Sequence, residues 1–294
     1  MDILRHEHAS GRIEAMYLLL SLNDFAILRR ARGNSKEAET LLREAVVLSS
    51  QANPKNKNRI GQIEATLTLT LADQGKFEEA ENRVGKQIAR LKETSKTESP
   101  EMCAALTMLG SIRIEKGEIA AAEANLRQAE TIYRKLYDPN FTAIYDNLRL
   151  QAQNLYLQGK LDEAETTVNQ ILENYRRNSS PQYISYATAL TVKGLILNKQ
   201  EKFVEAEAVL RQAARLRGEN LPKEHFMSAL TTGALGENLA EQKRFAEAEA
   251  FLLGSYNNLQ ASQSSENPRT LLAKRRLTDL YAAWGKPNAL ARFR

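Results

Sequence analysis

An Ala-Glu pair recurs every 42 residues along almost the whole chain. The six copies keep this interval without a slip, at Ala38-Glu39, Ala80-Glu81, Ala122-Glu123, Ala164-Glu165, Ala206-Glu207 and Ala248-Glu249. A glycine column stands five residues before the pair, at Gly33, Gly75, Gly117 and Gly159, and returns at Gly285. Self-similarity at a period of 20 to 50 residues is the signature of a repeat array. We therefore predict that the chain is built from copies of one structural unit.

Each unit is predicted to hold two α-helices. Near the start of one second helix, Phe77, Ala80 and Val84 are spaced by three and four residues, which places them on one apolar face. The glycine column lies where the first helix should end, because glycine takes the left-handed conformation at little cost. Glu201 and Lys243 replace this glycine in two units. Those turns are expected either to carry strain of about 1 kcal/mol each or to use another geometry.

Three further columns have a structural interpretation. The alanine of each Ala-Glu pair is small enough to let the two helices of a hairpin approach closely, and a larger residue would overpack the contact. Proline stands near the predicted start of most first helices, several times after a residue typical of an N-cap, at Pro54, Pro100, Pro139, Pro181, Pro222 and Pro268. Within the first helices, Gln151 and Lys193 interrupt an otherwise apolar column. They are consistent with a kink in the superhelix or with a ligand contact.

These columns resemble the tetratricopeptide repeat, which has alanine near the start of its second helix and a small residue midway along its first. The long period looks like the kinesin-light-chain type of that repeat, and residues 22–28 followed by 33–39 are especially similar to it. The resemblance implies an all-α fold, a right-handed α-solenoid of antiparallel helix hairpins.

The resemblance also implies how the chain is divided. It predicts one superhelical domain over residues 1–294, in which residues 1–14 form an N-terminal extension or cap. Six full units are expected at approximately 15–56, 57–98, 99–140, 141–182, 183–224 and 225–268, and a partial seventh at 269–294.

Composition argues for a cytoplasmic protein that binds neither nucleic acid nor membrane. The 41 basic and 36 acidic residues are interleaved, so basic runs such as 55–59 and 274–276 are interpreted as solvated helix faces. The single cysteine, Cys103, excludes an intramolecular disulfide. The first residues lack the apolar run of a signal peptide, and no stretch is long and apolar enough for a membrane span.

No catalytic or metal-binding constellation is visible in the sequence. It contains no phosphate-binding glycine loop followed by Lys and Ser or Thr. Three histidines are too few and too scattered to assemble the three or four converging ligands of a zinc site. Cys103 has no histidine predicted near it to act as a base. We therefore expect a non-enzymatic protein that uses no metal or cofactor.

The family resemblance implies a ligand-binding surface, because ligand contacts in this family come mostly from five positions on each first helix. Carried over to this chain, those positions give the predicted peptide- or partner-binding residues, which are Asn23, Arg30, Leu69, Arg149, Gln153, Tyr156, Leu157, Leu195, Asn198, Lys199 and Arg275. Amide and guanidinium groups can pair with the backbone of an extended peptide. Glu237, Glu241 and Asp279 make the C-terminal end more acidic, so a ligand with a basic part there is expected.

The leading hypothesis is a protein–protein interaction scaffold that binds a peptide segment or partner protein in a concave groove. The alternative is a sensor or regulatory arm of a larger bacterial signalling protein whose effector domain lies outside this chain. Residues 281–287 look like the last unit of repeat arrays attached to such proteins. Self-association by stacking of the terminal repeats is a further possibility, motivated by the truncated seventh hairpin. The sequence does not identify the partner.

Overall fold

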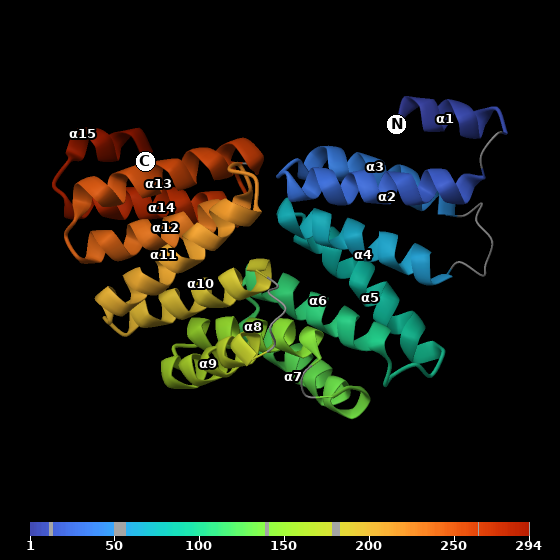
Figure 1. The fold of residues 1–294 in the computed structure, drawn as a ribbon, viewed down its shortest axis with the longest axis horizontal. Coiled ribbons are helices and arrows are strands. Elements are labelled where there is room, and N and C mark those ends of the chain that lie inside the picture. Colours follow the sequence, from blue (N-terminus) through green and yellow to red (C-terminus); the bar gives the residue numbers. More distant parts are fainter. Residues whose placement is uncertain (12–13, 50–56, 139–140, 178–182, 264, 294) are drawn as a thin grey trace. The chain divides into compact units, whose positions relative to one another are not determined.

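The computed structural model describes residues 1–11, 14–49, 57–138, 141–177, 183–263 and 265–293, and all regular structure within them is helical (Figure 1). The prediction of an all-α repeat fold is thereby confirmed. The chain divides into two compact units, Met1–Arg83 and Val84–Arg294. The single superhelical domain stays a prediction. Pro54, Pro139 and Pro181 of the predicted proline column lie outside the described residues.

The first unit contains a short N-terminal helix and the first repeated hairpin. Its helices are α1 (Asp2–Ala9), α2 (Ala15–Ala31), α3 (Ser35–Ser49), α4 (Lys57–Asp73) and the start of α5 (Phe77–Glu93), which continues into the second unit. Helix α1 packs on α2, and α4 packs on both helices of the α2/α3 hairpin. Leu19, Leu22 and Leu42 are fully buried at the centre of this hairpin.

The second unit stacks four complete hairpins and a final first helix. The hairpins are α6 (Pro100–Lys116) with α7 (Ile119–Leu136), α8 (Thr142–Leu157) with α9 (Leu161–Arg177), α10 (Tyr183–Lys199) with α11 (Phe203–Asn220), and α12 (Phe226–Glu241) with α13 (Phe245–Ser262). They are followed by α14 (Pro268–Ala283), α15 (Pro287–Leu290) and a 3₁₀ turn at Ala291–Phe293. Each first helix contacts the next first helix along the chain, so α6, α8, α10, α12 and α14 form one layer.

The turn inside each hairpin has the left-handed residue that the glycine column predicts. Gly117 ends α6 at a φ of 80°. Glu201 and Lys243 both have a φ of 62°, and the residue after each donates to a carbonyl five residues back, as Glu118 does after Gly117. The two exceptions therefore use the same geometry as glycine, and the expected strain of about 1 kcal/mol each applies.

Close packing explains the small residues. All six alanines of the Ala-Glu pairs are fully buried. A Cβ built on Gly194 would lie 2.4 Å from Leu210 of the second helix, and one on Gly110 would lie 2.7 Å from Leu126. Two predicted N-caps are also confirmed, since the side chains of Ser99 and Asn267 accept from backbone N–H groups in the first turns of α6 and α14.

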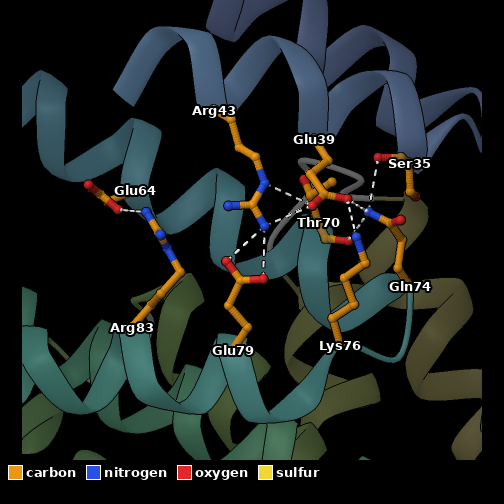
Figure 2. A network of polar contacts seen from close by, with 9 residues as sticks. All are labelled: Ser35, Glu39, Arg43, Glu64, Thr70, Gln74, Lys76, Glu79 and Arg83. Carbon is orange, nitrogen blue, oxygen red and sulfur yellow. Dashed lines mark hydrogen bonds and ion pairs between the residues drawn. The ribbon is translucent and has the colours of Figure 1, made fainter. Parts of the chain in front are cut away.

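The glutamate of the Ala-Glu pair ties one hairpin to the next (Figure 2). In the first unit, Glu39 accepts hydrogen bonds from the Gln74 amide at 2.8 Å and from Lys76 Nζ at 2.6 Å, both near the turn of the following hairpin. Arg43 donates to Glu39 and reaches across to Glu79. We call the Glu–Gln–Lys/Arg contact the inter-hairpin clamp.

The inter-hairpin clamp recurs in the second unit. Gln200 and Lys202 donate to Glu165, and Gln242 and Arg244 donate to Glu207 at 3.0 and 2.7 Å. The glutamine stands 35 residues and the cation 37 residues after each glutamate. In these three units, the Ala-Glu pair supplies an alanine for packing within a hairpin and a glutamate for the contact with its neighbour.

Candidate peptide-binding face

Three of the predicted binding residues lie in the first unit, on α2 and α4. Arg30 forms an ion pair with Asp73, with Nε 2.6 Å from Oδ2. Asn23 is buried, and its side-chain oxygen has no hydrogen-bond partner among the described residues. Leu69 is half-buried. The charge of Arg30 is therefore already neutralised within its own unit.

The other eight predicted residues lie on three first helices of the second unit. Helix α8 carries Arg149, Gln153, Tyr156 and Leu157, α10 carries Leu195, Asn198 and Lys199, and α14 carries Arg275. Leu157, Lys199 and Arg275 are exposed, whereas the other five are half-buried. Leu195 packs against the apolar core between α11, α12, α13 and α14.

Side chains of the first helices meet across a common interior in this unit. Arg269 of α14 lies 3.5 Å from Glu115 of α6, although these helices belong to hairpins far apart in the stack. Burial raises the pKa of Tyr156 on α8, and the nearby charge of Glu237 on α12 adds to this rise while Arg276 and Arg275 on α14 oppose it. We call the surface defined by Glu115, Arg149, Tyr156, Glu237, Arg269 and Arg275 the first-helix face.

The acidic gradient predicted for the C-terminal end is partly neutralised. Glu237 forms an ion pair with Arg276, with Nη2 2.6 Å from Oε2, and Arg276 is largely buried. Glu241 and Asp279 are exposed. The register carried over from the family did not include Arg269 or Arg276, so the sequence alone missed the cations that balance these carboxylates.

Polar pairs join neighbouring first helices to one another. Asn147 donates to Thr107 at 3.0 Å, and the hydroxyls of Thr191 and Thr231 lie 2.9 Å apart. Asn238 donates to the side-chain oxygen of Asn198 at 2.6 Å. The amide nitrogen of Asn198, in contrast, has no hydrogen-bond partner among the described residues. The side-chain oxygen of Asn198 therefore serves a structural contact between helices, whereas its amide nitrogen is unpaired among the described residues.

Gln151 and Lys193 both lie inside continuous first helices. Helix α8 runs without interruption from Thr142 to Leu157, and α10 continues likewise through Lys193. The Gln151 amide donates to Glu130 of α7 and to Asn147, both at 2.8 Å. This residue therefore replaces an apolar contact between hairpins with hydrogen bonds. Lys193 lies near enough to Glu165 of the inter-hairpin clamp to help lower the pKa of that carboxylate, after the larger effect of Gln200.

Arg149 of α8 combines partial burial with both acidic and basic neighbours. It is half-buried, and burial lowers its pKa while the charges of Asp146, Tyr175 and Glu115 oppose that change. Burial raises the pKa of Asp146 itself, against the effects of Arg149 and of a hydrogen bond with Ser185. A second arginine, Arg217 on α11, is near enough to repel Arg149. Sequence reasoning did not select Arg217, because it lies on a second helix, outside the family's ligand-contact positions.

Other kinds of site find no support in the described part of the chain. Within it, no group of three or more His, Cys, Asp and Glu side chains is placed to hold a metal ion. Among the same residues, no helix has the length and apolar character that a membrane crossing needs. Cys103 is buried, and burial raises the pKa of its thiol to about 11, which opposes thiolate formation at neutral pH.

Comparison with known proteins identifies the family. Models of the tetratricopeptide repeat match residues 104–136 and 144–219. Together with the hairpin geometry, these matches show tetratricopeptide repeats within the second unit. A search of curated protein sequences found no significant match.

Solved structures with the same fold share little sequence with the chain. A Rap protein in complex with competence and sporulation factor is 16% identical, with a TM-score of 0.69 over 98% of this chain and 77% of that one. BtubC (BKLC) from P. vanneervenii is 15% identical, with a TM-score of 0.54 over 74% and 87%. A putative kinesin light chain with TPR-like repeats from Podosopora anserina is 17% identical, with a TM-score of 0.50 over 69% and 97%. These likenesses concern the fold, and they agree with the kinesin-light-chain-like repeat expected from the 42-residue period.

Proposed function

We propose that this protein is a non-enzymatic scaffold that binds a peptide segment or a partner protein through the first-helix face of its second unit. The observation that carries the proposal is the unpaired polar chemistry of that face. Arg149 is half-buried with Asp146 as its main charged neighbour, and the Asn198 amide nitrogen has no hydrogen-bond partner among the described residues. Elsewhere in the repeats, the recurring polar residues are paired with one another.

The chemistry of the face suits an extended peptide. A guanidinium and an amide can bind backbone carbonyls or carboxylates, and Tyr156 with the exposed Leu157 offers apolar contact beside them. Because these groups project from packed helices, little of the protein needs to become ordered on binding. The solved Rap protein complex supports the proposal only in showing that a protein of this fold can hold a ligand.

The proposal is tested by comparing matched variants in pull-downs from native lysate with mass spectrometry. The test variant combines Arg149→Ala, Tyr156→Ala and Asn198→Ala. The control combines Asn169→Ala, Val204→Ala and Arg215→Ala, which remove similar groups from exposed positions on second helices. Circular dichroism melting first establishes that both variants are folded.

A protein retained by the wild type and the control, but lost by the test variant, would support recognition at the first-helix face. Equal retention by all three would place the interface elsewhere and contradict the proposal. If none of the three retains a protein, the alternative of a regulatory arm within a larger signalling protein becomes the better hypothesis.

A further inference from the structure

A small cavity lies between the second helices α7 and α9, and α8 completes its lining. Its volume of about 220 Å³ is below that of pockets for drug-sized ligands and suits a single side chain. The charged lining residues are Glu123, Arg127, Glu130 and Glu163. Glu130 pairs with Arg134 outside the cavity, whereas the exposed Glu163 makes no ion pair within the part of the chain that the structure describes. We call this cavity the α7/α9 pocket, and its lining is acidic.

Asn154 of α8 lines the α7/α9 pocket with a buried amide that is incompletely paired. It is 2% exposed, and its side-chain oxygen has no hydrogen-bond partner among the described residues. The equivalent residue two units later, Asn238, donates two hydrogen bonds and accepts one. In two other units the position holds a buried isoleucine, Ile112 or Ile196. Because a buried acceptor without a donor costs stability, the needs of the fold do not explain the asparagine here.

The inter-hairpin clamp beside the α7/α9 pocket lacks its cation. Gln158 donates to Glu123 at 2.9 Å, as in the other clamps. Lys160, at the position of the clamp cation, forms no ion pair with Glu123 within the described residues, whereas the equivalent cations of the other three clamps pair with their glutamates. Arg127 lies 2.7 Å from Glu123, but an arginine one turn on also pairs with the glutamate in two of those clamps. Compared with those two, Glu123 is short of one cation.

We propose that the α7/α9 pocket binds a guanidinium group, supplied by an arginine side chain of a partner protein. The guanidinium would donate to the Asn154 oxygen and pair with Glu123 and Glu163. At the clamp of Glu207, the chain itself places a guanidinium beside the glutamate, since Arg244 donates to it at 2.7 Å. Several donors in one plane allow a guanidinium to serve an amide oxygen and a carboxylate together. This pocket involves none of the residues that define the first-helix face, so the inference goes beyond the proposed function.

The proposal is tested by NMR titration of the isotope-labelled protein with N-acetyl-arginine methylamide. The side-chain amide signals of Asn154 and Gln158 should shift saturably, with a dissociation constant of about 1 mM, as expected for one side chain. The neutral isostere N-acetyl-citrulline methylamide should bind about tenfold more weakly or worse, because it lacks the charge. Free arginine should also bind more weakly, because the acidic lining repels its α-carboxylate.

Two variants identify the groups that bind the probe. Asn154→Ile installs the residue found in two other units, so it should melt at the same or a higher temperature than the wild type. Followed through the Gln158 signals, its dissociation constant should rise about tenfold or more. Glu163→Gln should raise the constant about two- to fivefold, because an exposed ion pair is weaker. Glu219→Gln, at an exposed position of α11, is the matched control and should bind like the wild type.

The proposal is overturned if the wild type shows no saturable shift, if the arginine and citrulline probes bind alike, or if Asn154→Ile binds like the wild type. A clearly lower melting temperature of Asn154→Ile would show that the amide supports the fold, and would also overturn it. Tighter binding of free arginine would contradict a residue of a partner chain as the ligand. These results do not depend on the pull-down, so the pocket and the proposed function can fail separately.

Discussion

The inter-hairpin clamp and the first-helix face use polar residues in opposite ways. In the clamp, Glu207 receives hydrogen bonds from Gln242, Arg244 and Arg211, and equivalent residues recur at a fixed spacing in other hairpins. On or beneath the first-helix face, Arg217 and Asn198 do not recur, and donors of both are unpaired among the described residues. The difference teaches that repeated polar residues hold the stack together, whereas unrepeated ones are available for recognition.

The largest expected effect comes from overfilling a repeated packing position. Gly194→Val places a Cβ where Leu210 already lies, and we expect it to lower the free energy of unfolding by about 1–3 kcal/mol. Gly218→Ala on α11 meets nothing within 4 Å and should leave stability unchanged or raise it by up to about 1 kcal/mol. Urea denaturation of both variants measures the difference. Equal midpoints would show that the small-residue column is not a packing requirement.

A smaller effect should follow from breaking one clamp. Glu207→Ala removes the acceptor shared by Gln242, Arg244 and Arg211, and we expect a loss of about 1–2 kcal/mol because the contact is only partly shielded from water. Glu219→Ala, at an exposed position of the same helix, serves as the control in urea denaturation.

The clamp variant should also retain any partner found in the pull-down as well as the wild type does. If the folded Glu207→Ala protein lost that partner, the clamp would also take part in binding, and the assignment of separate roles to the clamp and the first-helix face would be wrong.

The smallest expected effect is on the stability of the fold at acid pH. A hydrogen bond from Gln200 lowers the pKa of Glu165 below its ordinary value of 4.5, and Lys202 adds to this effect while burial opposes it. A carboxylate with a lowered folded-state pKa contributes stability above its unfolded pKa and loses it as the pH falls through the folded value. Glu165→Gln should therefore lose less stability than the wild type between about pH 5 and pH 3. Parallel pH profiles of melting temperature for the two proteins would contradict this prediction.

The repeated features could be predicted because they depend on neighbours at fixed spacing. The alanine column, the hairpin turns and two N-caps follow from local sequence, and the turns at Glu201 and Lys243 keep the common geometry despite lacking glycine. The clamp was visible in principle, as the glutamine column at Gln74, Gln158, Gln200 and Gln242. Recognising it required knowing which turn faces which second helix.

The contacts across the interior could not be predicted from spacing. Arg269 and Glu115 meet because small rotations between successive hairpins add up, and a sequence pattern does not specify that sum. Arg217 was missed for a related reason, since it reaches Thr188 from a second helix outside the family's ligand-contact positions. The eleven predicted binding residues stay a prediction, to be tested by the variants described above.

Because each inter-hairpin clamp joins only adjacent hairpins, the clamps pass cooperativity from one hairpin to the next. Such an array has no central point whose loss unfolds everything, and its segments can open while the rest remains folded. Weakening one clamp should then create a boundary between two separately melting blocks. Hydrogen exchange would reveal that boundary as a step in protection between the hairpins on either side of the altered glutamate.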